Sequence, residues 1–219
     1  DRSVSRGLGD VYKRQMKYYS ACGYDAICVT DHYNRECFDY ADIDLTTPGS
    51  KTQAFLLGYH RLKREAEKYN IRVYAGAELR FDGSDNDYLL YGFHDELLAD
   101  PDRVMREGLA AFAPQYRADG ALLVQAHPFR KKCTPAPAEY LDGIEVLNLN
   151  PRHDSHNDLA LAYAKEHHLI MTAGSDCHRP GDQGTTGILS DTLPEDSFGL
   201  ADLLRSGNYT IIHPECTED

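Results

Sequence analysis

The stretch Leu169-Ile170-Met171-Thr172-Ala173-Gly174-Ser175-Asp176-Cys177-His178 decides the fold class, because a short apolar run ends in a turn that carries metal-binding side chains. The run has the length and composition of a buried strand. In an extended backbone, residues two apart point to the same side, so the Asp176 carboxylate and the His178 imidazole can converge on one cation or on a pair of cations. The sequence therefore predicts chemistry at the carboxyl end of a strand.

Short β-type runs alternate with helical patterns along most of the chain. The predicted strands cover residues 24–30, 71–77, 88–93, 121–126, 143–148, 169–173 and 209–213. The predicted helices cover residues 51–69, a segment from Pro101, a segment from the N-cap Ser155 towards His167, and residues 197–205, closed by Gly207. Alternation of this kind predicts an α/β protein with a parallel sheet.

Composition restricts the partners. The length of 219 residues suits one substantial domain, and 23 Lys and Arg against 35 Asp and Glu give a net charge of −12, which argues against stable nucleic-acid binding. The six cysteines form no Cys-x-x-Cys pair, which predicts a reducing compartment. Without a membrane-length apolar run or a signal region, we expect a cytoplasmic protein with no membrane partner. The oligomeric state has no signature in the sequence.

Residues of metal-ligating or polar types follow five of the predicted strands. They are Asp31 and His32, Glu78, His127, Asn148, and Asp176 with His178. A parallel α/β barrel gathers its active site at these strand ends. His, Asp and Glu without paired cysteines suit catalytic Zn, Mn or Fe rather than a closed structural zinc. Because two such cations can activate a shared water and clamp a phosphoryl group, the pattern predicts phosphoester hydrolysis.

Basic residues follow His127 closely. Arg130 begins the only uninterrupted run of three basic residues in the chain, and its guanidinium suits a bidentate grip on phosphate. The next two residues, Lys131 and Lys132, fit a solvated loop slightly better than a phosphate site. Arg152 is a second candidate for phosphate. Its neighbours His153 and His156 either bind substrate or cap the next helix.

Five motifs, in order along the chain, resemble those of the PHP (polymerase and histidinol phosphatase) family. They are residues 23–32 (GYDAICVTDH), 76–78 (GAE), 126–128 (AHP), 143–148 (GIEVLN) and 174–178 (GSDCH). The resemblance extends over about residues 16–212. It implies a distorted (β/α)7 TIM-like barrel that holds two or three divalent metals, of the Zn, Mn or Fe type, at the C-terminal face of its strands.

The resemblance also implies roles for individual residues. The implied metal ligands are His32, Glu78, His127, Asp176 and His178. His32 and His178 would share one metal, Glu78 would bridge two others, His127 would bind one of these, and Asp176 would complete the remaining one. We expect catalysis to depend on Glu78, Asp176 and His178. The expected substrate-binding residues are Arg130, Arg152 and Asn148.

The sequence departs from the family pattern in two places. Residues 1–15 contain VSRGLGDVYKRQ, which resembles translated sequencing-adaptor sequence, so we expect a foreign or disordered segment followed by a PHP-like barrel domain over residues 16–219. The family's His-x-His motif on the first strand is absent, since His32 is the earliest histidine. We therefore expect a fragment that lacks the first strand and is impaired.

The second departure concerns a further ligand. Where many relatives place a histidine before a Leu-Leu strand, this chain has Asp87. Either Asp87 or a water substitutes for the histidine, or one metal position stays empty. His94, beyond that strand, could compensate, although a surface role suits it better.

Together these observations predict a metal-dependent phosphoesterase that hydrolyses a small phosphomonoester or nucleotide through a metal-activated hydroxide. Histidinol phosphatase activity is compatible with the resemblance, but no residue selects that substrate. One alternative is a catalytically impaired PHP-like module that serves regulation or binding. Another is metal-dependent hydrolysis of C–N or C–O bonds on a similar barrel.

Overall fold

A computed structural model of the chain describes residues 4–39, 50–179, 182 and 186–212. Its α-helices are α1 (Val4–Ala21), α2 (Arg35–Asp39), α3 (Ser50–Ala66), α4 (Pro101–Asp119), α5 (Asn157–Glu166) and α6 (Ser197–Ser206). Its strands are β1 (Ala26–Val29), β2 (His32–Tyr33), β3 (Arg72–Leu79), β4 (Tyr88–Tyr91), β5 (Leu122–Gln125), β6 (Gly143–Asn148), β7 (Ile170–Gly174), β8 (Gly187–Leu189) and β9 (Thr210–Ile212). Short 3₁₀ helices are η1 (Glu67–Tyr69), η2 (Asp95–Leu98) and η3 (Ala138–Tyr140).

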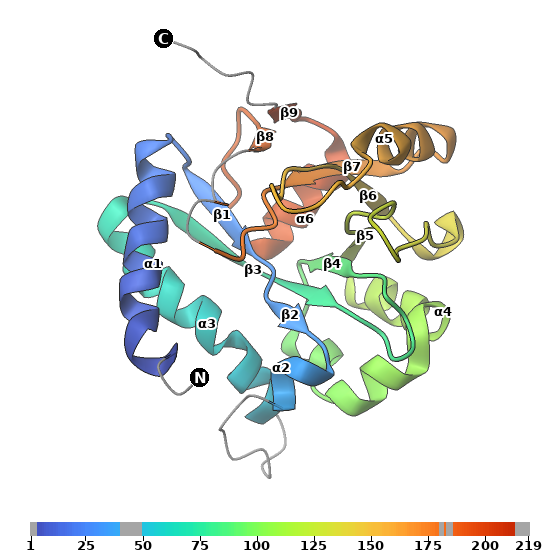
Figure 1. Ribbon diagram of the computed structural model, residues 1–219, viewed down its shortest axis with the longest axis horizontal. Helices are drawn as coiled ribbons and strands as arrows, with labels where there is room; N and C mark the ends of the chain where they lie inside the picture. The colour runs from blue at the N-terminus through green and yellow to red at the C-terminus, as the bar shows by residue number, and fades with distance from the viewer. Residues whose placement is uncertain (1–3, 40–49, 180–181, 183–185, 213–219) are drawn as a thin grey trace.

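A seven-stranded sheet forms the centre of the fold. Its strand order is β1-β3-β4-β5-β6-β7, and β2 pairs with the far end of β3. Figure 1 shows that this sheet curls strongly, with α1 and α3 side by side on one flank. Within the described residues no ladder joins β1 to β7, so the sheet is an open half-barrel. The predicted α/β class and distorted-barrel architecture are confirmed in this form.

Strand β4 runs against the predicted direction. It pairs antiparallel with both β3 and β5, with Tyr88 opposite Leu79 on one side and Gln125 on the other. A parallel crossover needs a dozen or more residues, and residues 80–87 are too few to supply one. The prediction of a parallel sheet is therefore wrong for β4, whereas the other pairs of this sheet are parallel. As a result, the start of β4 lies at the same edge as the carboxyl ends of β3 and β5.

The last strand is also placed differently from the prediction. β9 pairs antiparallel with β8 in a separate two-stranded sheet instead of joining the central one. The predicted strand 209–213 ends at His213, which lies outside the described residues. Cys216 does too, and the five described cysteines are unpaired.

Two predicted helices are confirmed closely. Helix α3 and the following η1 cover the predicted segment 51–69, and α6 ends before Gly207, whose φ of 68° makes the left-handed cap that glycine favours.

At the start of the chain, α1 begins at Val4, inside the segment 1–15 that the sequence analysis expects to be foreign or disordered. Met16 on α1 is fully buried among side chains that include Leu62. None of the described helices is both long and apolar enough to span a membrane.

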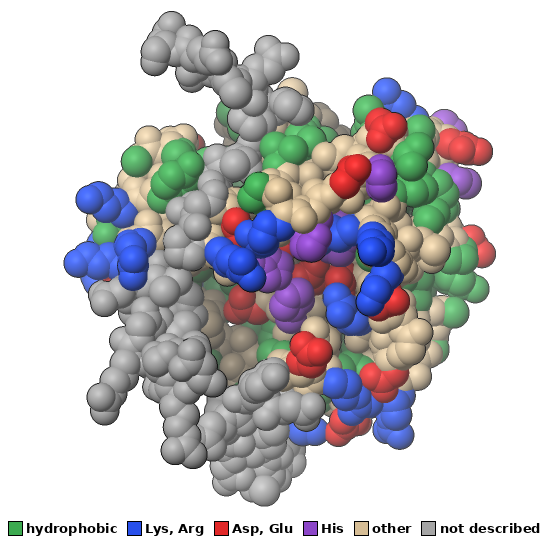
Figure 2. All heavy atoms as spheres, viewed as in Figure 1, with side chains coloured by type: hydrophobic (Ala, Val, Ile, Leu, Met, Phe, Trp, Pro, Cys, Tyr) green, Lys and Arg blue, Asp and Glu red, His purple; other side chains and the backbone are tan. Residues whose placement is uncertain are grey.

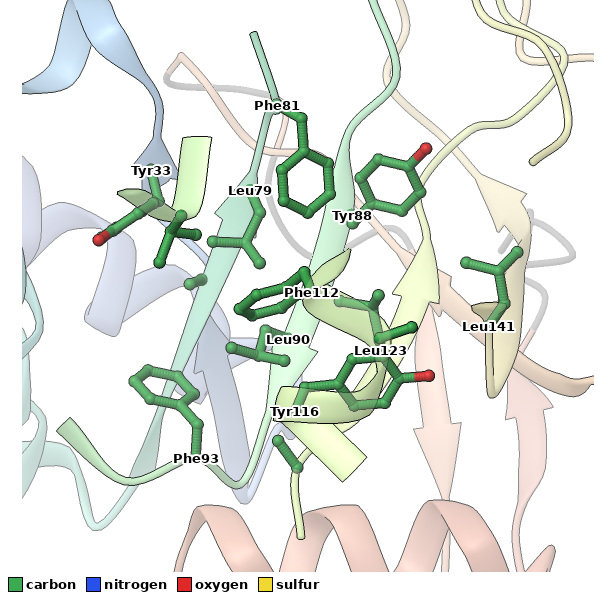
Figure 3. Packing of buried hydrophobic residues seen from close by; sticks show 14 of the residues in the cluster. Tyr33, Leu79, Phe81, Tyr88, Leu90, Phe93, Phe112, Tyr116, Leu123 and Leu141 are labelled. Atoms are coloured by element: carbon green, nitrogen blue, oxygen red, sulfur yellow. The ribbon is translucent and has the colours of Figure 1, made fainter. Parts of the chain in front are cut away.

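The main core lies between the middle strands and helix α4. Figure 3 shows Leu79, Leu90 and Leu123 from neighbouring strands packed beside Phe112 and Tyr116 of α4. All five side chains are almost completely buried. Burial of each side chain contributes roughly 1.5–3 kcal/mol to stability. This packing fixes the strands relative to one another and so positions the polar residues that follow them.

Candidate metal centre

The five predicted metal ligands line one cavity of about 520 Å³. They are His32, Glu78, His127, Asp176 and His178. Figure 2 shows the same chemistry from outside, with His, Asp and Glu side chains gathered in a hollow and Lys and Arg around it. The residues that follow separate strands therefore meet at one place, as the strand-end argument predicted.

Glu78 occupies the middle of this group. Its Oε2 lies 3.0 Å from Nδ1 of His32, and its Oε1 lies 3.4 Å from Nε2 of His127. The parallel register of β2 and β3 sets His32 opposite Glu78. Burial favours the neutral acid, yet the contacts with His127 and His32 outweigh burial and lower the pKa of Glu78 to about 2. One ionised carboxylate thus faces two different histidines, the geometry of a bridging ligand.

Asp87 joins Glu78 and His127, which the strand-end rule did not predict. One ligand atom from each of these three buried residues lies within 4.8 Å of the others. The reversed direction of β4 explains this, because Asp87 immediately precedes that strand. Both Asp87 oxygens also accept from Arg80, at 2.7 and 2.6 Å. The alternative candidate His94 lies on the surface, where it pairs with Asp119 at 3.2 Å.

His32 and His178 form a second pair of donors. Their Nε2 atoms lie 3.1 Å apart, close to the roughly 3.3 Å that two imidazoles on one tetrahedral zinc would show. Nδ1 of His32 faces Oε2 of Glu78 at 3.0 Å, and this contact raises the pKa of His32. Two imidazole nitrogens this close together, with a buried carboxylate beside one of the rings, are a donor set that fits a cation. The donor set of both groups, His with Asp and Glu, suits Zn, Mn or Fe.

Asp176 connects His178 to the guanidinium of Arg130. Its Oδ1 lies 3.0 Å from Nδ1 of His178, and its Oδ2 accepts from Nη2 of Arg130 at 2.6 Å. Burial opposes ionisation, but these two contacts hold the pKa of Asp176 far below its ordinary value. The hydrogen bond to Asp176 in turn raises the pKa of His178 to about 9.

Two of the predicted ligands have unusual backbone conformations. His127 has a φ of 30° and Asp176 a φ of 49°, in the left-handed region that non-glycine residues rarely adopt. Each such residue costs on the order of 1 kcal/mol or more, and strain of this kind concentrates at functional sites. The surrounding contacts must therefore hold both residues in place.

The predicted substrate-binding residues are hydrogen-bonded to other side chains of the protein. Nη2 of Arg130 contacts Asp176 and also donates to Oδ1 of Asn148 at 2.9 Å. Arg152 pairs with Asp182 at 2.5 Å, and Asp182 accepts from the backbone N–H of His178 at 3.0 Å. Arg130 and Arg152 thus support the strand-end loops in this structure. Their role in holding phosphate stays a prediction.

The turn before α5 differs from its prediction. The helix begins at Asn157, with His156 rather than Ser155 at the N-cap position and without a side-chain cap bond. Ser155 is instead buried, and its hydroxyl lies 3.3 Å from Arg130 Nη2 and 3.4 Å from Asn148 Oδ1. An N-cap pattern in the sequence could not reveal this inward role. His153 is exposed at the surface of the same turn.

Comparisons with known proteins agree with this fold. Residues 154–206 match a family model described as PHP-associated. A two-domain protein from Bacteroides vulgatus ATCC 8482, which contains a predicted PHP-like metal-dependent phosphoesterase, superimposes with a TM-score of 0.65 at 16% identity over 92% of this chain. The chain has a PHP-like fold. It spans 60% of the length of that Bacteroides protein.

Two further solved structures have folds similar to that of this chain. PsfC from Pseudomonas syringae PB-5123 gives a TM-score of 0.62 at 18% identity, covering 93% of this chain and 82% of its own. A protein from Bifidobacterium adolescentis ATCC 15703, named as a candidate metal-dependent phosphoesterase, gives 0.50 at 14% identity, covering 89% and 90%. No curated protein sequence matches the chain significantly.

Proposed function

We propose that the protein is a metal-dependent phosphoesterase that hydrolyses a small phosphomonoester or nucleotide. The position of Glu78 carries the proposal, since its two oxygens face His127 and His32. Asp87 completes the first donor group and His178 the second. The fold shared with the phosphoesterases named above supports the same reaction class.

Each donor group would hold one divalent cation. Glu78, Asp87 and His127 would form one site, and His32 with His178 would form the other, with Glu78 between them. Bound cations would supply Lewis-acid activation of water and neutralisation of charge on the phosphoryl oxygens. Asp176 orients the ring of His178 through Nδ1, which keeps Nε2 directed towards His32.

Positive charge near the cavity favours an anionic substrate. The whole chain carries a net charge of −12, yet Figure 2 shows Lys and Arg side chains around the hollow that holds the histidines. Lys131 and Lys132 are exposed in the loop after His127. Cations at the mouth of a cleft raise the local concentration of anions. Arg130, beside Asp176, would add to stabilisation of the charge that develops during hydrolysis.

The test combines metal analysis with a phosphate-ester panel. We expect the purified protein to contain divalent transition metal by plasma mass spectrometry and to hydrolyse at least one phosphomonoester or nucleotide. Replacing the central carboxylate, Glu78→Gln, should lower metal content and activity by about 100-fold. The matched control is Glu67→Gln, the same chemical change at an exposed position on η1, which should leave both unchanged.

Two results would contradict the proposal in different ways. A protein without bound divalent metal, even after incubation with Zn²⁺ and Mn²⁺, would refute the metal centre. Metal binding without hydrolysis of any phosphate ester would favour the regulatory or binding module. Hydrolysis of amide or carboxylic ester substrates alone would favour the C–N or C–O alternative.

A further inference from the structure

Glu145 is a buried acid that the proposed reaction does not use. It lies on β6 with 3% of its surface exposed. Its Oε2 accepts two hydrogen bonds of 2.9 Å, from the backbone N–H of His127 and from Nδ2 of Asn148. Burial raises the pKa of Glu145 to about 7, and a carboxyl group this deep in the protein is costly unless it is hydrogen-bonded.

A β-bulge explains how Glu145 and Asn148 reach each other. Residues three apart in a regular strand point to opposite faces. The pairing of β6 with β7 shifts register between Glu145 and Leu147, which turns the end of β6 so that Asn148 meets the Glu145 carboxylate. Bulges often redirect side chains next to active sites.

The two hydrogen bonds join the two halves of the candidate site. His127, held through its backbone N–H, belongs to the group with Glu78 and Asp87 and has a φ of 30°. Asn148, held through its amide, donates to Asp176 at 3.3 Å and accepts from Arg130. One carboxylate therefore supports the backbone of a strained candidate ligand and the environment of another.

The opposite strand leaves room for this carboxylate. A Cβ atom added at Gly174 on β7 would lie 2.7 Å from Oε1 of Glu145, closer than real Cβ contacts allow. The next nearest atom, Cδ of the same side chain, is 3.9 Å away. An alanine at position 174 would therefore displace the end of the Glu145 side chain, and no other side chain lies within 4 Å of the added Cβ.

We propose that Glu145 is a positioning residue that aligns His127 with the Asn148, Arg130 and Asp176 group, and that Gly174 provides the space for its carboxylate. The proposal extends the metal centre of the proposed function. It assigns to Glu145 the alignment of ligands rather than direct contact with a cation.

The test moves the carboxylate without removing it. Gly174→Ala should displace the Glu145 side chain and accelerate hydrogen exchange of the His127 amide at least about tenfold. Calorimetry should show Mn²⁺ binding weakened about tenfold or more. Glu145→Asp alone should also weaken Mn²⁺ binding, because the shorter side chain withdraws from the His127 N–H. The control is Gly187→Ala, where the new Cβ would meet only the Tyr24 ring at an ordinary 3.5 Å.

Combining the substitutions tests the mechanism. In the double variant Glu145→Asp/Gly174→Ala, the shorter Asp leaves room for the Ala methyl group. The double variant should therefore lose less Mn²⁺ affinity than the product of the two single fold-losses. The thermal unfolding midpoint of every variant is measured beside its Mn²⁺ affinity. A loss of affinity that is proportional to the fall in unfolding midpoint across the variants would overturn the proposal. Independent effects of the two substitutions, or Gly174→Ala behaving as Gly187→Ala does, would overturn it as well.

Failure of the proposed function gives a different result. If the wild-type protein binds Mn²⁺ but hydrolyses no phosphate ester, the activity proposal fails, and the affinities still decide the role of Glu145. If the wild-type protein binds no Mn²⁺, the hydrogen-exchange rate of the His127 amide still tests the positioning role of Glu145. Unchanged exchange in Gly174→Ala would then refute the positioning role.

Discussion

Metal binding should compete with protons on His127. Burial disfavours the charged imidazolium of His127, but contacts with Cys133 and Glu78 outweigh burial and raise its pKa to about 10. The side chain is 4% exposed, so solvent screens these contacts little. At neutral pH the metal-free protein therefore carries a proton on His127 that a divalent cation must displace.

The size of this competition follows from the pKa. Removing a proton from a group with a pKa of about 10 at pH 7 costs about 4 kcal/mol, at roughly 1.4 kcal/mol per pH unit. Raising the pH from about 7 to about 8.5 removes about 2 kcal/mol of that cost, which strengthens binding about 30-fold. His178 adds a second proton, but its side chain is 44% exposed, so solvent reduces its contribution.

Isothermal titration calorimetry with Mn²⁺ measures both quantities. Titrations over this pH range, in buffers of different ionisation enthalpy, should show stronger binding at higher pH and release of one to two protons. His60→Gln, at an exposed position on α3, should leave this pH dependence unchanged. An affinity that does not vary with pH, or binding without proton release, would show that His127 is neutral and would refute the reasoning.

The stability of the metal-free protein should change in the opposite direction. A raised folded pKa means that the stabilisation from His127 is complete below its unfolded value of 6.5 and disappears as the pH rises to about 10. Thermal unfolding after chelation should therefore show a falling midpoint between these two pH values. A midpoint that rises over the window would contradict the assignment.

Three further predictions concern single substitutions. Asp87→Asn should weaken Mn²⁺ binding about 10- to 100-fold in calorimetry. His94→Gln should leave Mn²⁺ binding unchanged, since His94 lies on the surface with Asp119. Equal effects of the two substitutions would contradict a role of Asp87 in metal binding. Leu90→Ala empties a fully buried core position and should lower the free energy of unfolding in urea by about 2–5 kcal/mol; a loss below 1 kcal/mol would contradict the packing. Gly143→Ala places a Cβ 2.7 Å from the Ile170 carbonyl oxygen and should destabilise the β6–β7 pairing by about 1–3 kcal/mol; an unchanged unfolding curve would contradict that contact.

The position of the candidate site could be predicted because strand ends are local features. Each predicted ligand follows an apolar run in the sequence, and parallel strands bring their carboxyl ends to one edge. The structure places His32, Glu78, His127, Asp176 and His178 around one cavity accordingly. Their roles as ligands stay predictions.

Direction and register could not be predicted in the same way. Asp87 precedes its strand, so it reaches the site only because β4 is antiparallel to both neighbours. Ser155 has the pattern of an N-cap, yet it turns inward to Arg130 and Asn148. Both outcomes depend on pairing between segments that are distant in the chain.

The sequence by itself determined the α/β class, most strands of the half-barrel and the chemistry at their ends, because apolar periodicity and residue type are local properties. Only the tertiary structure decided which charges meet. Arg130 pairs with Asp176 rather than pointing to solvent, and Glu145 connects His127 to Asn148 across a bulge. The physical reason is burial, since a charge removed from water must find its partners within the fold, wherever they lie in the chain.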